Sequence, residues 1–197
     1  MSNNDWKIVA IEKAVSQEDL NNILIDTPPE YGGLRNTNVF YINGKFDRVE
    51  EEFKVLPTTA RYNYPKYKEI CYKLKSSIEN FMGEKLYPTY YFDRFYFSGS
   101  SLHKHIDRPA CEISVSLQIS NTTGVDWPLN FLSGEETLGY VMRPGDAILY
   151  KGMEFLHWRD KLECPKDAYF HQAFFHYVRA DGYYLQYAND ILPTPNK

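Results

Sequence analysis

The stretch from His103 to Gln118, HKHIDRPACEISVSLQ, decides the fold that this sequence predicts. His105 and Asp107 are separated by one residue, so in an extended backbone both side chains leave the same face of the chain. From Cys111 onward, apolar and polar residues alternate, and this period of two predicts a strand with one face turned to a core. The stretch therefore predicts a β-strand that directly follows two residues able to bind a metal.

A third residue of the same kind stands fifty positions after Asp107. The segment GDAILYKGMEFLHWRD, residues 145–160, contains His157. Two imidazoles and one carboxylate are the ligands of facial-triad sites, which hold iron(II) and leave coordination positions open. We therefore predict that His105, Asp107 and His157 bind one metal ion. His103 shares a strand face with His105, but the single-residue gap to Asp107 favours His105.

The surroundings of these residues predict many short strands. Apolar or alternating segments separated by turn residues lie at 87–97, 102–107, 111–120, 127–133, 137–142, 147–151 and 168–178. Regularly spaced short strands are typical of sandwiches and barrels, including jelly rolls and cupin-like forms. The seventeen Tyr and twelve Phe favour the same class, because aromatic side chains fit the pleated surface of a sheet.

The N-terminal part predicts helices and extended segments. A strand is expected at about 6–12, a helix at about 17–25, an extended segment at 38–44 and a long helix at about 65–82. Apolar residues at three- and four-residue spacing carry the last prediction. We expect one domain of mainly β (α+β) class over residues 1–197. Residues 1–85 would support a β core at 86–180, and residues 181–197 would form a tail.

Charge and cysteine content narrow the functional classes. Lys plus Arg number 22 against 26 Asp plus Glu, so the formal net charge is −4 and no overall basic field favours nucleic acid. No apolar run reaches the ~18 residues that a membrane span needs. The three cysteines are widely spaced and the first residues do not resemble a secretory leader, which favours a reduced, cytoplasmic protein.

These motifs together resemble a known family. The segment YFSGSSLHKHID at 96–107, followed by WPLNF, PGDA and His157, is similar to the catalytic core of 2-oxoglutarate- and iron(II)-dependent dioxygenases, nearest to the prolyl-hydroxylase-like branch. The resemblance covers about residues 87–178. It implies a double-stranded β-helix, which is a jelly roll, braced by N-terminal helices. The implied reaction uses O2 and 2-oxoglutarate, yields succinate and carbon dioxide, and hydroxylates an unactivated C–H bond.

The resemblance also implies roles for single residues. His105, Asp107 and His157 would hold the iron(II), and Tyr96 stands where a tyrosine commonly hydrogen-bonds the cosubstrate. A cation should bind the far carboxylate of 2-oxoglutarate, since a guanidinium can form two parallel hydrogen bonds with it. The family usually supplies this cation from the last core strand, where this chain has His171. We predict Arg159 first and His171 second.

Other residues are weaker candidates for the same pocket. Of His171 and His176, which have opposite strand parity, one should point inward. Further candidates for substrate contact or for the pocket wall are Arg94, Arg108, Trp158 and Gln172.

Two alternatives to an oxygenase stay open at this point. The first is a jelly-roll binding or structural protein with a degenerate metal site. The second is a cupin-type metalloenzyme that does not use 2-oxoglutarate. The substrate could be a small molecule or a peptide or protein, because a fold does not specify which ligand its site takes. The sequence does not indicate an oligomeric state.

Overall fold

The structure is a computed structural model that describes residues 6–24, 37–42, 44–49 and 57–190. Its two helices are α1 (Gln17–Leu24) and α2 (Tyr67–Met82). Its strands in the first half are β1 (Ile8–Ile11), β2 (Thr37–Ile42), β3 (Lys45–Val49), β4 (Thr58–Tyr62) and β5 (Leu86–Phe97). The later strands are β6 (Leu102–His105), β7 (Ile113–Asn121), β8 (Leu129–Ser133), β9 (Glu136–Tyr140), β10 (Ala147–Tyr150), β11 (His157–Arg159) and β12 (Tyr169–Arg179).

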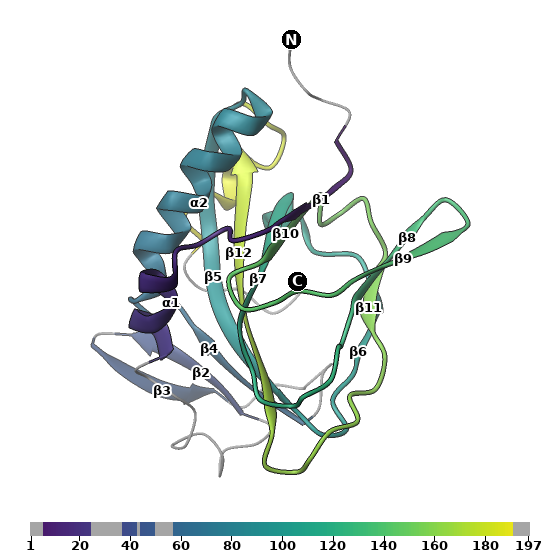
Figure 1. Ribbon diagram of the computed structural model, residues 1–197. Coiled ribbons are helices and arrows are strands. Elements are labelled where there is room, and N and C mark those ends of the chain that lie inside the picture. Colours follow the sequence, from purple (N-terminus) through teal and green to yellow (C-terminus); the bar gives the residue numbers. More distant parts are fainter. Residues whose placement is uncertain (1–5, 25–36, 43, 50–56, 191–197) are drawn as a thin grey trace.

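The strands form two sheets that face each other (Figure 1). The large sheet has the order β1-β10-β7-β12-β5-β4-β2-β3, and the small sheet has the order β6-β11-β8-β9. Neighbouring strands run antiparallel except β2 and β4, which are parallel. This arrangement confirms the predicted mainly β jelly roll.

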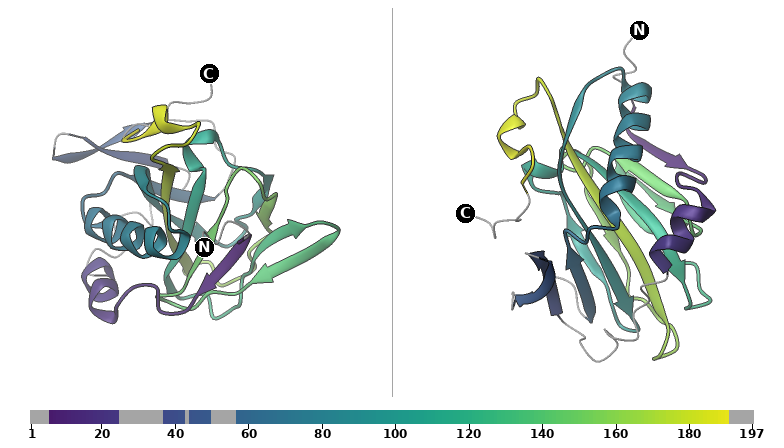
Figure 2. Two further views of the ribbon diagram at one scale, coloured as in Figure 1. Left: turned by 90° about the horizontal axis from the view of Figure 1, so that it is seen from above. Right: turned by 90° about the vertical axis from the view of Figure 1, so that its left-hand side faces the viewer.

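Both helices cover one face of the large sheet (Figure 2). Helix α2 buries a stripe of residues at three- and four-residue spacing, which are Tyr67, Ile70, Cys71, Leu74, Ile78 and Met82. The helix ends at Gly83, whose φ of 73° is a left-handed conformation that glycine adopts without steric cost. The bracing helix predicted at about 65–82 is therefore confirmed.

Strand β7 separates the helix-covered core from the interior between the sheets. Its apolar residues Ile113, Val115 and Leu117 pack into the same core as the helices. Its polar residues Ser114 and Ser116 point the other way and are also fully buried. The alternation predicted from the sequence is correct. The polar face, however, faces the protein interior rather than solvent.

The N-terminal part does more than brace the core, because its strands belong to the large sheet. Strand β1 pairs with β10 at one edge, and β4 pairs with β5 and extends the sheet through β2 and β3. At the other end of the chain, a short 3-10 turn covers Leu185–Tyr187. The remainder of the predicted tail, residues 191–197, lies outside the described residues. In the described part, neither helix is long and apolar enough to cross a membrane.

Candidate metal centre and cavity

Two neighbouring strands of the small sheet bring the predicted metal ligands together. His105 ends β6 and is the register partner of His157, which begins β11. Asp107 follows two residues after His105, and its Oδ1 lies 3.6 Å from His105 Nε2 and 3.5 Å from His157 Nε2. One ligand atom from each of the three residues lies within 4.8 Å of the others. The spacing suits three ligands on one side of a single ion.

The ring orientation of both histidines is fixed by the backbone of their own strands. His105 Nδ1 donates to the carbonyl oxygen of His103 at 2.8 Å, and His157 Nδ1 donates to that of Phe155 at 2.9 Å. Because a carbonyl can only accept, each Nδ1 carries the proton and each Nε2 presents a lone pair. His103 therefore supports His105 through its backbone, and its own side chain is exposed.

Asp107 is held from two sides. Its backbone N–H donates to the Gly152 carbonyl at 2.9 Å, and Ser114 Oγ donates to Asp107 Oδ2 at 2.9 Å. Oδ1, which faces both imidazoles, remains available to an ion. Gly152 has no room for a side chain, since a Cβ there would overlap the Cys111 carbonyl oxygen and the Asp107 carboxylate.

The protonation states of the three groups fit a divalent metal ion. Burial lowers the pKa of His157 below 6.5, despite the opposing charge of Asp107, so its imidazole is neutral. Burial alone would raise the pKa of Asp107. Interactions with the neighbouring histidines, His105 first among them, outweigh burial and lower this pKa below 3.8, so the carboxylate is ionised. Neutral imidazoles and an ionised carboxylate are the forms that bind metals.

These residues border a cavity of about 220 Å³ between the two sheets. Its walls come from β5, β7, β10 and β12 of the large sheet and from β6, β8 and β11 of the small sheet. An aromatic part of the wall consists of the closely stacked rings of Tyr90, Phe92 and Phe174. The cavity thus combines an aromatic patch with metal-binding and other polar groups, as small-molecule sites commonly do.

Arg159 lies in this cavity wall and is nearly inaccessible to solvent, with 2% of its surface exposed. Its guanidinium lies over the rings of Trp127 and Phe170, at 4.5 Å and 5.1 Å from their centroids. Nη1 donates to the Trp127 carbonyl, whereas Nη2 has no hydrogen-bond partner in the described protein. Burial lowers the pKa of Arg159 to about 10, so the group is still charged at neutral pH.

Other predicted residues also line this cavity. Tyr96 on β5, Gln172 on β12 and Arg94 on β5 all line it. Gln172 is fully buried, and its Oε1 has no partner within the described residues. The structure thus brings Arg159 and Tyr96 together on the wall of the cavity that the three metal-binding residues border.

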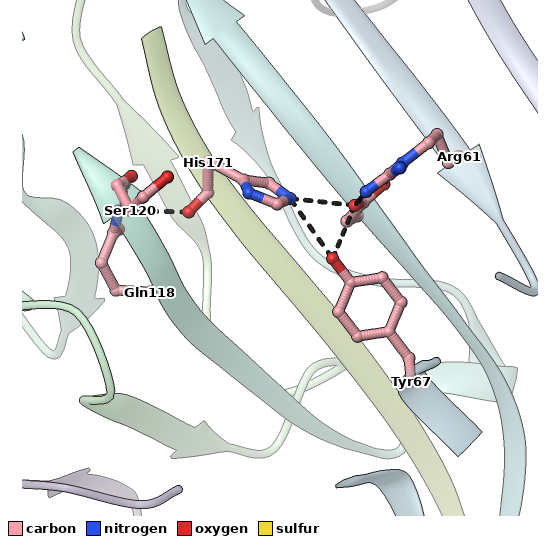
Figure 3. A network of polar contacts seen from close by, with 6 residues as sticks. Arg61, Tyr67, Gln118, Ser120 and His171 are labelled. Atoms are coloured by element: carbon pink, nitrogen blue, oxygen red, sulfur yellow. Dashed lines mark hydrogen bonds and ion pairs between the residues drawn. The ribbon is translucent and has the colours of Figure 1, made fainter. Parts of the chain in front are cut away.

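His171 does not line the cavity, so the prediction that it contacts a cosubstrate there is wrong. Its side chain points to the opposite face of the large sheet, where Nε2 lies 2.9 Å from Asp93 Oδ2 and 3.3 Å from Tyr67 Oη (Figure 3). Asp93 also forms a buried ion pair with Arg61. His171 lies on a strand that borders the cavity, but the next residue, Gln172, carries the side chain that faces inward.

Of the remaining predicted residues, one lines the cavity and two do not. His176 points inward and lines the cavity, so of the two strand histidines it is the inward one. Arg108 pairs with Asp190 at 3.0 Å and lies over Tyr90, which indicates a structural role. Trp158 faces away from the cavity and packs under Lys104.

Sequence reasoning missed Ser114, Gly152 and Phe174 as contributors to the site. Ser114 could have been suspected, because a serine on the polar face of a buried strand must find a hydrogen-bond partner. Gly152 follows a strand, and no sequence motif marks its position. Phe174 is indistinguishable in sequence from the core aromatic residues beside it.

Comparisons with known proteins support the fold. No protein-family model and no curated protein sequence matches the chain. A solved oxidoreductase of the 2OG-Fe(II) oxygenase family from Burkholderia pseudomallei aligns with a TM-score of 0.64 at 13% identity, covering 96% of this chain and 91% of that one. HygX from Streptomyces hygroscopicus, solved with nickel and 2-oxoglutarate, gives 0.60 at 10% identity over 88% and 83%.

A third solved structure is the collagen prolyl hydroxylase of Paramecium Bursaria Chlorella virus-1, in complex with 2-oxoglutarate. It gives a TM-score of 0.58 at 10% identity and covers 88% of this chain and 97% of that chain. Likenesses at this level of identity speak for the fold. The chain has the double-stranded β-helix fold of the 2-oxoglutarate- and iron(II)-dependent oxygenases, as the motif resemblance implied.

Proposed function

We propose that this protein is a 2-oxoglutarate- and iron(II)-dependent oxygenase that hydroxylates an unactivated C–H bond. One observation carries the proposal. The ligand atoms of His105, Asp107 and His157 lie within 4.8 Å of one another at a cavity whose wall holds the buried guanidinium of Arg159. One nitrogen of this guanidinium has no hydrogen-bond partner among the described residues. A metal triad alone would suit several enzyme classes. The added buried cation favours an anionic cosubstrate.

Bound iron(II), together with 2-oxoglutarate and O2, would supply the oxidising chemistry of the reaction. The protein contributes positioning and electrostatics. The carbonyls of His103 and Phe155 orient the two imidazoles, and Ser114 orients Asp107. Such supporting contacts fix the tautomer and the geometry of metal ligands.

Arg159 is proposed to bind the far carboxylate of 2-oxoglutarate, with Tyr96 beside it. Nη2 of Arg159 has no partner among the described residues, and it would gain a charge-assisted hydrogen bond to a carboxylate oxygen. The buried setting strengthens such a bond, because few water molecules compete for the guanidinium. Trp127 and Phe170 hold the group in place and keep solvent away from it.

The proposal is tested by loading the protein with iron(II) and following 2-oxoglutarate and succinate by NMR in air-saturated buffer, with metal content measured in parallel. We expect one metal ion per chain and succinate formation that requires both metal and 2-oxoglutarate. Metal binding without any use of 2-oxoglutarate would instead indicate a cupin-type metalloenzyme. If the protein binds neither metal nor 2-oxoglutarate, the alternative of a binding or structural protein applies.

A further inference from the structure

The arginines whose side chains the structure describes divide into two groups. Four of the described arginines form ion pairs with carboxylates, namely Arg61 with Asp93, Arg108 with Asp190, Arg143 with Asp126, and Arg179 with Glu84 and Glu112. The other two with described side chains, Arg94 and Arg159, form no ion pair in the part of the protein that the structure describes. Both of them line the cavity.

Arg94 is the less buried of these two cations. It lies on β5 opposite Gln172 of β12, and its guanidinium carbon is 5.5 Å from the ring centroid of Phe92 and 6.0 Å from that of Tyr96. Its Nε is buried without a hydrogen-bond partner within the described residues. Desolvating a guanidinium nitrogen without compensation costs free energy, so the arrangement favours a ligand that supplies the acceptor.

The sum of the charges in the cavity indicates different roles for Arg94 and Arg159. On the proposed function, a divalent metal ion, the Asp107 carboxylate, Arg159 and doubly negative 2-oxoglutarate together sum to zero. Asp107 is the only acidic residue among those that line the cavity in the described structure. The positive charge of Arg94 then remains uncompensated, and a further anion can balance it.

We propose that Arg94 binds a carboxylate of the primary substrate and thereby selects small carboxylic acids with a flat apolar body. The inference rests on the proposed function and adds the substrate class. The apolar body would pack on the wall of Tyr90, Phe92 and Phe174. In this wall the Phe92 and Phe174 rings stack with centroids 4.7 Å apart, and Tyr90 stacks on Phe92 at 6.0 Å. Aromatic rings favour such offset stacking.

The test uses matched pairs of ligands that differ only in charge. Manganese(II) replaces iron(II), so that the protein binds 2-oxoglutarate without turnover. Benzoate, phenylacetate and 3-phenylpropanoate, each against its neutral amide, are titrated calorimetrically into this loaded protein. We expect at least one acid to bind roughly 10–100-fold more tightly than its amide, the range for a charge-assisted hydrogen bond.

Three variants show whether Arg94 causes that preference. Arg94→Gln should reduce the acid-to-amide ratio to about one, and Arg94→Lys, which keeps the charge, should retain part of it. Arg143→Gln, which removes an exposed arginine paired with Asp126, should leave the ratio unchanged. Thermal unfolding confirms that each variant is folded before titration.

Either of two results would overturn the inference. The wild type could bind no acid more tightly than its amide, or the preference for the acid could remain in Arg94→Gln. If Arg94→Gln instead weakens 2-oxoglutarate binding as strongly as Arg159→Gln does, Arg94 is the cosubstrate anchor. The substrate inference is then wrong, while the proposed function stands. If the loaded wild type does not bind 2-oxoglutarate at all, the proposed function fails and the inference fails with it.

Discussion

The two faces of strands β5 and β12 differ in whether their buried polar groups have hydrogen-bond partners. On the helix side, Asp93 accepts hydrogen bonds from Arg61, Tyr67 and His171, so each of these four residues has a partner (Figure 3). On the cavity side, buried atoms of Arg94, Ser116, Arg159, Gln172 and His176 have no partner among the described residues. Strands β5 and β12 contribute to both arrangements, since Asp93 is followed by Arg94 and His171 by Gln172.

This difference separates structural from binding chemistry. A buried ion network that is fully hydrogen-bonded stabilises a unique packing and leaves nothing for a ligand. A set of buried polar atoms without partners costs folding free energy, and proteins keep such sets where a ligand or ordered water completes them. The comparison predicts that changes on the helix side alter stability and that changes on the cavity side alter ligand binding.

The largest effect should follow Asp93→Asn on the helix side. The variant removes the carboxylate from the buried ion pair with Arg61, and breaking a buried ion pair typically costs about 3–5 kcal/mol. Urea unfolding measures the loss, and the metal affinity of the folded protein should not change. Tyr67→Phe removes one hydrogen bond of 2.6 Å and serves as a milder variant if Asp93→Asn does not fold. Unchanged stability in both variants would contradict the structural role.

Asp107→Ala should abolish tight metal binding and leave the fold intact. Loss of a supporting contact typically weakens metal binding 10–100-fold, so loss of a ligand should cost at least roughly 100-fold. Calorimetric titration with manganese(II) measures the affinity. Asp126→Ala, at an exposed ion pair with Arg143, is the matched control and should bind metal like the wild type. His105→Ala should behave like Asp107→Ala, and normal affinity would remove that residue from the ligand set.

Arg159→Met should weaken 2-oxoglutarate binding by roughly 10–100-fold, since it removes a charge-assisted hydrogen bond. The same change should stabilise the ligand-free protein by about 1 kcal/mol or more, because replacing a buried charge with an apolar side chain often does so. His171→Gln is the control on the other face and should leave 2-oxoglutarate affinity unchanged. If His171→Gln alone weakened 2-oxoglutarate binding, the cosubstrate would bind on the helix side of the large sheet and not in the cavity.

Gly152→Ala should weaken metal binding by about 10-fold through displacement of Asp107, whose carboxylate would overlap the new Cβ. Gly134→Ala is a control at a turn where a Cβ meets no atom within 4 Å, although its positive φ makes alanine strained there. Manganese titrations and thermal unfolding of both variants distinguish the two effects. Equal metal affinity in both would mean that Gly152 does not position Asp107.

The smallest expected effect is on the free energy of unfolding at acidic pH. Burial lowers the pKa of His171, although the Asp93 carboxylate beside it opposes this. The unfolded chain therefore takes up a proton near pH 6.5 that the folded protein does not, and stability falls as the pH decreases below that value. In His171→Gln, unfolding free energies between pH 7.5 and 5 should decline less steeply. An identical slope would show that His171 does not contribute.

Periodicity and local motifs predicted much of this structure. The helix at Tyr67–Met82, the alternating strand β7 and the clustering of His105 with Asp107 all depend on contacts between near neighbours in sequence. His157 could be predicted because its residue type completed a known ligand set. The alternating pattern could not show that the polar side of β7 is buried, since that depends on a second sheet formed by distant segments.

The predicted contact of His171 with a cosubstrate depended on which face of β12 points into the cavity. Alternation holds along this strand, because Gln172, Phe174 and His176 all line the cavity while His171 points to the opposite face. The sequence pattern alone does not specify which of the two faces is the inward one, because both are buried. Arg94 could not be distinguished from a structural arginine until the ion pairs of the other arginines were known.

The most direct test of the central claim is a calorimetric titration of 2-oxoglutarate into the wild-type protein, with and without manganese(II). If the metal triad and Arg159 form one site, 2-oxoglutarate should bind one-to-one to the manganese-loaded protein and at least roughly 10-fold more weakly without metal. Equal affinity in both states would place 2-oxoglutarate away from the triad. No binding in either state would contradict the oxygenase proposal itself.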